Sequence, residues 1–289
     1  MSRGNHLPAG AMLFAPVQMA EKFPGHRLVA RSGDPSSFQE LLGADGLKRV
    51  EYLQLTNLDA DPSPLMKWDS VLPIELVMRE PGREFPRLYA YARLLDRGPV
   101  RVSIPAADGI EKAVKLAASL HFSVKIIPGQ PEPGQVEHLI HLTDFYLTNP
   151  TITQPIEFFH SLFFAMLNNL DTTLWEILEK EPTRFCFVTD DGQMAANEPR
   201  QIPALEIRSE KAAEIKSGRK ENHHSPSQSV MNRHKTCAVC TYSRWCRGFF
   251  KYPSADYSCT AVFPLFEYLF TAAAELNQDM SASVPGVQP

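Results

Sequence analysis

The apolar residues between His26 and Val188 follow two alternating patterns. Short runs of β-branched and aromatic residues are typical of strands, and apolar residues three or four positions apart are typical of helices. Strands are predicted at residues 26–30, 49–55, 73–78, 100–104, 123–127 and 184–188. Helices are predicted at 35–42, 85–95, 110–121, 135–142, 156–170 and 172–180, with a loop at 59–69 and an edge strand at 144–147.

The clearest unit runs from Val100 to Ile127. An apolar strand at 100–104 is followed by a turn, by a helical pattern at 110–121 and by a second strand at 123–127. A strand, a helix and a further strand form a right-handed parallel crossover by default. Repeated along the chain, this step predicts an α/β fold, either an incomplete (β/α) barrel or an open sheet.

The flanking segments divide the chain further. Residues 1–25 contain one short apolar patch at 11–15, which Pro8 and Pro16 keep short on either side. They are predicted to form a loosely ordered arm. The partial barrel would occupy 26–207, followed by a linker at 208–235 in which basic residues outnumber acidic ones. A small domain at 236–280, closed by a helix at 263–280, and a disordered tail at 281–289 complete the division.

Composition and charge narrow the class of protein. A hydrophobic fraction of 44% and a charged fraction of 21% are typical of soluble globular proteins. The net charge of -4 gives no indication of a nucleic-acid or anionic-membrane partner. The longest apolar run, 156–167, is shorter than the ~20 residues that span a bilayer and contains Glu157 and His160. These features predict a cytoplasmic protein.

Four of the five cysteines lie between Cys237 and Cys259. Cys237 and Cys240 form a CxxC pair, which presents two thiolates to one metal, and Cys246 and Cys259 can complete a set of four ligands. Zinc and iron–sulfur clusters both accept four thiolates. Basic residues that would offset the charge of a cluster lie in or beside the motif at Lys235, Arg244, Arg247 and Lys251. Together with aromatic residues that exclude water, they favour an iron–sulfur cluster, with zinc as the alternative. We expect one 4Fe-4S cluster, although the sequence does not define the number of iron atoms.

The motif resembles the SPASM domain, or its shorter twitch form, found at the C-terminus of many radical SAM enzymes that modify peptides. The matching positions are Cys237, Cys240, Cys246, Gly248, Phe250, Lys251, Tyr257 and Cys259, followed by the closing helix. A full SPASM domain has seven cysteines for two clusters. With four cysteines, this segment resembles a domain that holds at most one cluster.

The predicted barrel resembles a radical SAM core, but the catalytic motif of that family is missing. Such enzymes bind a cluster through CxxxCxxC in the first βα loop. The loops at residues 31–37, 56–70 and 79–84 contain no cysteine, and Cys186 is the one cysteine outside the C-terminal motif. The resemblance therefore implies a degenerate barrel that does not cleave S-adenosylmethionine on its own.

A degenerate barrel joined to a SPASM-like domain is similar to the GeoRSP-type companion proteins of peptide-modifying systems. The resemblance implies an accessory protein whose partners are a radical SAM enzyme and a ribosomally made peptide, and which binds them or passes electrons. A zinc-stabilised interaction module is the alternative. An independent enzyme with dispersed active-site residues is a third hypothesis, for which no GxSxG, HExxH or Gly-rich phosphate loop is present.

Four other residues have an ordinary structural interpretation. Cys186 lies between two phenylalanines in a predicted strand and is interpreted as a buried structural thiol. His138 and His141 are three positions apart on a predicted helix near Glu137 and Asp144, which could form a metal-binding face. Because no opposing ligand can be placed from the sequence, a solvated polar face is the interpretation. His160, among phenylalanines, is interpreted as a hydrogen-bonded core histidine.

Overall fold

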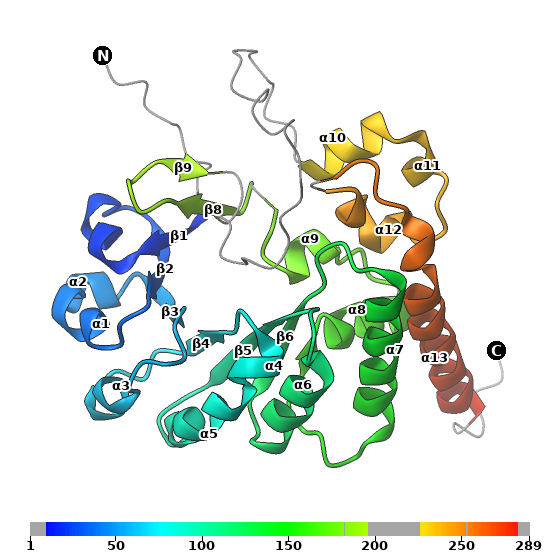
Figure 1. Ribbon diagram of the computed structural model, residues 1–289. Coiled ribbons are helices and arrows are strands. Elements are labelled where there is room, and N and C mark those ends of the chain that lie inside the picture. The colour runs from blue at the N-terminus through cyan, green and yellow to red at the C-terminus, as the bar shows by residue number, and fades with distance from the viewer. Residues whose placement is uncertain (1–9, 182, 196–225, 253, 283–289) are drawn as a thin grey trace, which may run out of the picture.

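A computed structural model describes residues 10–181, 183–195, 226–252 and 254–282. Its centre is a curved nine-stranded sheet in the order β7-β6-β5-β4-β3-β2-β1-β8-β9, in which all neighbouring strands are parallel except β8 and β9 (Figure 1). The strands are β1 (Met12–Pro16), β2 (Arg27–Ser32), β3 (Val50–Leu55), β4 (Ile74–Val77), β5 (Val100–Pro105), β6 (Ser123–Ile127), β7 (Ile156–Glu157), β8 (Phe185–Val188) and β9 (Met194–Ala195). The predicted α/β fold with an incomplete barrel is confirmed.

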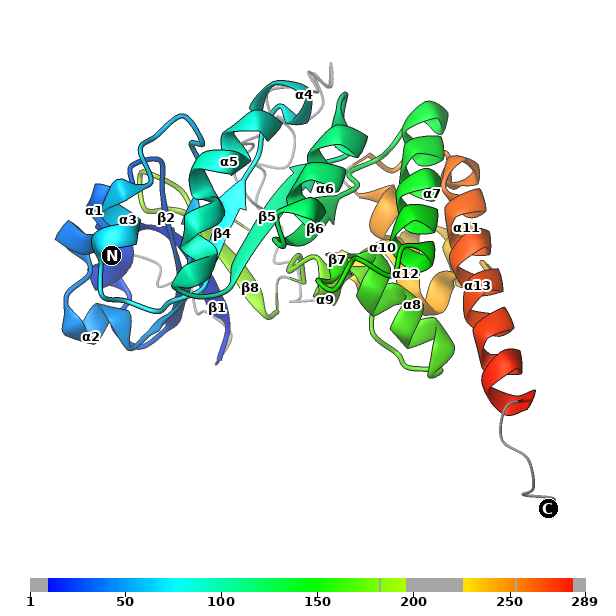
Figure 2. The ribbon, with the colours of Figure 1, turned by 90° about the horizontal axis from the view of Figure 1, so that it is seen from below.

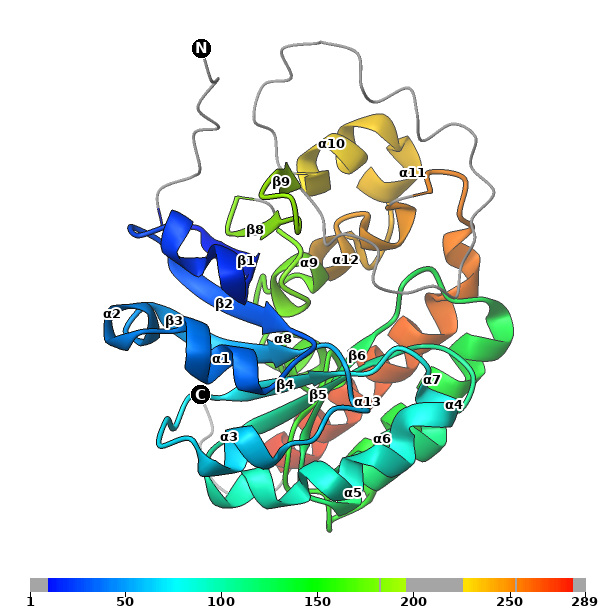
Figure 3. The same cartoon turned by 60° about the vertical axis from the view of Figure 1, so that its left-hand side comes forward.

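Helices cover the outer face of this sheet (Figure 3). They are α1 (Ser36–Leu41), α2 (Ala44–Leu47), α3 (Ser63–Lys67), α4 (Pro81–Glu84), α5 (Leu88–Tyr91), α6 (Ile110–Ser119), α7 (Pro133–Thr148) and α8 (Phe159–Leu167), with 3-10 turns η1 (Val17–Lys22), η2 (Phe85–Arg87) and η3 (Ala92–Asp96). Alternate strand residues such as Leu13, Leu53 and Val102 are buried in the main core, to which α6 contributes Ala113 and Val114. Burial of these apolar side chains is the main source of the sheet's stability.

Several predicted elements are corrected. Residues 12–16, predicted as part of an arm, form β1, which pairs with both β2 and β8. Leu13 and Phe14 are buried, so the apolar patch belongs to the core. The predicted loop at 59–69 contains α3, and the predicted edge strand at 144–147 is the last part of α7. α7 is continued there because Leu142 and Thr143 are buried on its inner side.

Two further boundaries differ from the prediction. The helix predicted at 156–170 begins only at Phe159, because Ile156 and Glu157 pair with β6 as β7. Within the predicted basic linker, residues 226–233 form α10 (Pro226–Arg233). The rest of that linker up to residue 225, most of the predicted disordered tail and residues 1–9 of the arm lie outside the described residues.

The C-terminal segment packs against one end of the barrel (Figure 2). It comprises α10, α11 (Lys235–Ala238), α12 (Ser243–Cys246), η5 (Phe249–Lys251), η6 (Cys259–Ala261) and α13 (Phe263–Ala282). By length and composition alone, residues 259–280 could cross a membrane, with a mean hydropathy of 1.2. In the structure α13 lies against α7 and α8, and Leu265, Phe266 and Leu269 are buried in that contact. These three residues of α13 thus serve packing within the protein, whereas Phe270, Leu276 and Met280 on the same helix are exposed.

Candidate metal centre

The backbone around Cys246 folds back sharply towards its own sulfur. Arg247 and Gly248 both have left-handed φ angles, of 42° and 73°, directly after α12. This reversal brings the backbone N–H groups of Gly248, Phe249 and Phe250 into hydrogen bonds with the Cys246 sulfur. Successive N–H groups that converge in this way favour a negatively charged ligand. The three N–H groups therefore offset part of the cost of burying a thiolate at Cys246.

Gly248 is required by its surroundings as well as by its φ angle. A Cβ atom at this position would lie 2.3 Å from Cγ1 of Val230 on α10 and 3.9 Å from the Cys237 sulfur. Only glycine fits this approach without movement of its neighbours. The residue therefore fixes α10 against the cysteine motif.

All four predicted ligand cysteines line one cavity of about 320 Å³. Cys237 lies in α11, Cys246 at the end of α12 and Cys259 at the start of η6, so three separate turns converge here. The other lining residues are Thr236, Tyr242, Ser243, Gly248, Lys251, Ser258, Thr260, Val262, Phe263 and Phe266. The structure brings the four cysteines together, and their role as ligands stays a prediction.

The thiols of this cavity influence one another electrostatically. Burial raises the pKa of Cys259, the Lys251 ammonium opposes that shift, and the neighbouring Cys237 and Cys240 raise the pKa further. Burial likewise raises the pKa of Cys237. For Cys246 burial dominates over the three backbone N–H bonds and raises the pKa to about 12. Without a metal the buried thiols keep their protons, and a metal that binds here must displace them.

Hydrogen bonds hold this centre against the barrel. Trp245 donates its indole N–H to the carbonyl of Leu170 at 3.1 Å, and Trp175 of α9 (Leu174–Ile177) donates to the carbonyl of Arg247 at 3.1 Å. Gln130, which follows β6, donates to the carbonyls of Phe250 and Ser254, both at 2.8 Å. Because Trp175 and Gln130 donate to backbone carbonyls of the motif itself, the barrel fixes the shape of the cysteine turns.

The inner face of the sheet carries a second polar group of residues. Glu75 of β4 is 1% exposed and accepts hydrogen bonds from Gln54 at 2.9 Å and from Ser103. Arg101 of β5 lies 3.2 Å from the carboxylates of both Glu75 and Glu179, and Lys125 of β6 contacts the same two carboxylates. Two positive and two negative side chains are thereby paired inside the barrel.

The pairing determines the charges of these groups. Burial opposes ionisation of Glu75, but the charges of Arg101 and Lys125 outweigh it and hold the pKa of Glu75 well below its usual range. For Arg101, burial likewise opposes the charge, and Glu75 and Glu179 outweigh it and raise its pKa. The same two cations lower the pKa of Glu179 against the effect of burial, and the mutual contacts of the four side chains occupy this part of the barrel interior.

Sequence reasoning missed this inner-face group, although a signal was present. Glu75, Arg101 and Lys125 each lie between apolar residues in a short strand. Parallel strands are buried on both faces, so a charged residue in the middle of one implies a charged partner. The aligned register supplies it, because Glu75 lies opposite both Gln54 and Arg101.

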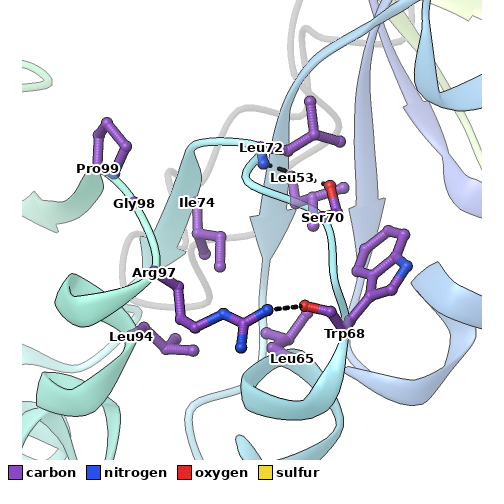
Figure 4. A pocket seen from close by; sticks show the side chains of 10 residues that line it. All are labelled: Leu53, Leu65, Trp68, Ser70, Leu72, Ile74, Leu94, Arg97, Gly98 and Pro99. Carbon is purple, nitrogen blue, oxygen red and sulfur yellow. Dashed lines mark hydrogen bonds between the residues drawn. The ribbon is translucent and has the colours of Figure 1, made fainter.

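A small cavity at the amino end of β4 is not a candidate site. It measures about 10 Å³ and lies between Leu53, Leu65, Ile74 and Leu94, where Arg97 donates to the carbonyl of Trp68 (Figure 4). This volume holds no more than about one water molecule. Barrel enzymes also place their active sites at the opposite, carboxyl end of the strands. The cavity is a packing feature.

Comparison with known proteins gives one informative match. No family model matches the chain, and no curated protein matches it. A solved structure of the radical SAM enzyme anSMEcpe, His6-tagged and with bound AdoMet, superimposes with a TM-score of 0.58 at 15% identity, over 93% of this chain and 99% of that one. The chain has a radical SAM-like fold. The predicted resemblance to a radical SAM core is confirmed at the level of the fold.

In this radical SAM-like fold, the first βα connection lies earlier in the chain than the sequence predicted, because β1 precedes β2. The first strand is Met12–Pro16, so the first βα connection is residues 17–26, which contain no cysteine. Cys186 lies in β8, 8% exposed, and burial raises its pKa. The expected absence of a CxxxCxxC motif therefore holds at the corrected position as well.

Proposed function

We propose that this protein is an iron–sulfur accessory protein that assists a partner radical SAM enzyme in modifying a ribosomally made peptide. It would bind the enzyme or the peptide and relay electrons through one 4Fe-4S cluster held by Cys237, Cys240, Cys246 and Cys259. One observation carries the proposal. Four thiols line a single cavity in the C-terminal segment, whereas the first βα connection of the barrel has no cysteine.

The spacing of the thiols supports a cluster over a single zinc ion. Four thiolates around one zinc at about 2.3 Å would lie roughly 3.8 Å from one another. Within the described part of the chain, three metal-ligand atoms lie within 4.8 Å of one another only at Glu111, His138 and His141, so no three of the four thiols lie this close together. A cavity of about 320 Å³ also exceeds the need of one ion.

The surroundings also suit a negatively charged cluster. Three backbone N–H groups point at the Cys246 sulfur, and the Lys251 ammonium lowers the pKa of both Cys237 and Cys259 against the effect of burial. Hydrogen bonds to the sulfurs and nearby charge set the reduction potential of such a centre. When bound, the cluster would supply one-electron transfer, and this chain would hold it, charge-balance it and shield it.

The CxxC turn offers a contact point for the partner. Val239, between Cys237 and Cys240, is 86% exposed, and Cys240 itself is half-buried. A large apolar side chain exposed beside a metal centre is a feature that partner docking would explain. Docking at this turn would bring the partner close to the sulfur ligands, as electron transfer requires.

Metal content tests the cluster. Protein purified without oxygen should be brown and contain about four iron atoms and matching sulfide per chain. Cys237→Ser and Cys259→Ser should lose the iron and the broad visible absorption. Cys186→Ser, which changes the cysteine of β8, is the matched control and should keep both. Colourless protein with one zinc ion per chain would support the zinc-stabilised interaction module and remove the electron relay.

Two assays test the accessory role. The reduced protein alone should not cleave S-adenosylmethionine, and turnover by the protein alone would establish an independent enzyme. With a radical SAM enzyme encoded beside its gene, Val239→Asp should weaken binding at least tenfold and keep the iron. Val71→Asp, at a distant residue that is 74% exposed, is the control. Equal binding by both variants would rule out docking at the CxxC turn.

A further inference from the structure

Two histidines of α7 and one glutamate of α6 converge on the outer surface. Nδ1 of His138 lies 2.7 Å from Oε1 of Glu111, and Nδ1 of His141 lies 3.5 Å from the same oxygen. The three ligand atoms all lie within 4.8 Å of one another. The sequence placed the two histidines on one helical face and could not place a third ligand. Glu111, from a neighbouring helix, supplies it.

We propose that Glu111, His138 and His141 form a site for a divalent transition metal of the zinc class, which would link α6 to α7. Imidazole nitrogens select such metals over magnesium and calcium, which prefer oxygen ligands. Three protein ligands with water in the remaining position are a common zinc arrangement. The histidine side chains are 55% and 70% exposed, which leaves room for that water.

The ligand distances are close to those of a zinc site. With bonds of about 2.1 Å in a tetrahedral site, ligand atoms lie roughly 3.4 Å apart. The separation of His141 from Glu111 already has this value, and that of His138 must lengthen by about 0.7 Å. The third separation, between the two imidazole nitrogens, is at most 4.8 Å. Both imidazoles are exposed, so rotation of their side chains is expected to adjust these distances.

Neighbouring contacts orient the glutamate. Lys115 donates to Oε2 of Glu111 at 3.2 Å, which leaves Oε1 directed at the two histidines. Hydrogen bonds of this kind to a ligating carboxylate are typical of metal sites. Asp144 on the same helix is engaged elsewhere, because it accepts a hydrogen bond from Tyr268 of α13 at 2.7 Å. The ligand set is therefore Glu111, His138 and His141 without Asp144.

Both helices are anchored behind the ligands. Gly109, with φ of +84°, precedes α6, and a Cβ there would lie 2.3 Å from the Cα of Gly82 in α4. This close approach fixes the first turn of α6, which carries Glu111. On α7, Leu139 and Leu142 are buried beside the two histidines. Rigid supports hold the ligands near the required geometry in advance.

Zinc titration of the full chain tests the site. A chromophoric chelator in competition should report one zinc equivalent that is lost, or weakened at least tenfold, in Glu111→Gln and in His141→Gln. Glu137→Gln makes the same chemical change at an exposed residue of α7 next to His138 and should bind as the unmodified protein does. Magnesium at a hundredfold excess should not compete. Equal zinc affinity in Glu111→Gln and Glu137→Gln would overturn the proposal.

A second pair of measurements distinguishes zinc bound at Glu111, His138 and His141 from zinc bound by the cysteines. In the Cys237→Ser/Cys240→Ser variant the Glu111-dependent equivalent should remain. A ligand that binds only the folded state raises its stability. Zinc should therefore raise the Tm of the double cysteine variant, but not the Tm of the same variant with Glu111→Gln added. Loss of the equivalent in the cysteine variant alone would also overturn the site. Neither result depends on whether the cysteines hold iron.

Discussion

Single residues decide whether the cysteine turns can form at all. Gly248 combines a left-handed φ of +73° with a close approach to Val230, and it lies directly before two of the N–H groups that reach the Cys246 sulfur. Two separate costs therefore fall on any side chain at this position. One is the backbone conformation, which costs roughly 1–2 kcal/mol for an L-residue. The other is overlap with Val230.

Gly248→Ala should lower the free energy of unfolding of the C-terminal segment by about 2–5 kcal/mol, as the sum of the backbone and overlap costs. Chemical denaturation followed by tryptophan fluorescence measures it, since Trp245 lies in that segment. Val230→Ala, added to Gly248→Ala, should restore only the overlap part. Gly134→Ala in α7, where a Cβ meets nothing within 4 Å, is the control. Equal stability of the Gly248 and Gly134 variants would contradict this account.

At the scale of elements, the strands are held on two faces by different forces. Their outer faces bury apolar side chains, and the inner faces of β4, β5 and β6 carry Glu75, Arg101 and Lys125. A buried ion pair gives little net stability, but removal of one partner leaves the other charge buried and uncompensated. The inner-face group is therefore sensitive to single changes.

Glu75→Gln should lower the free energy of unfolding by about 3–5 kcal/mol at pH 7, because Glu179 alone cannot balance both Arg101 and Lys125 and one positive charge is left buried without a partner charge. The pKa of Glu75 is below its usual 4.5 when folded, so its contribution is complete above that pH and declines as the pH falls further. The difference in free energy of unfolding between the unmodified protein and Glu75→Gln should thus become smaller below about pH 4.5. Urea unfolding at several pH values measures it, with the exposed Glu80→Gln as control. A gap that widens in acid would contradict the pairing.

The sequence predicted the elements whose pattern is local and missed those that depend on neighbours. Strands such as β5 and helices such as α6 follow from hydrophobic period alone. β1 has only five residues, the last of them Pro16, and β7 has two. Each is therefore defined by the strands that it pairs with. The four cysteines were found by spacing within one segment. Glu111 was not, because its histidine partners lie on another helix.

At the scale of the whole molecule, the C-terminal segment depends on the barrel for its shape. The sequence shows two regions, but hydrogen bonds from Gln130 and Trp175 of the barrel end on carbonyls of the cysteine turns. In return, Tyr257 donates to the carbonyl of Pro131 at 2.6 Å. The loop after β6 and the cysteine turns thus satisfy each other's polar groups, so the candidate metal centre is built at their junction.

Gln130→Ala tests this dependence, because it leaves the half-buried carbonyls of Phe250 and Ser254 without their donor, at a cost of roughly 1–3 kcal/mol. Native-state hydrogen exchange should show faster exchange at residues 249–262, by about tenfold to a hundredfold at most. Amides of β5 should keep their protection, since local opening of the turns leaves the pairing of β5 with β4 and β6 intact. Gln18→Ala, at an exposed residue of η1, should change neither region. Acceleration of β5 by the same factor would show that turns and barrel open only together, and unchanged exchange in the turns would show that they hold their shape without the barrel.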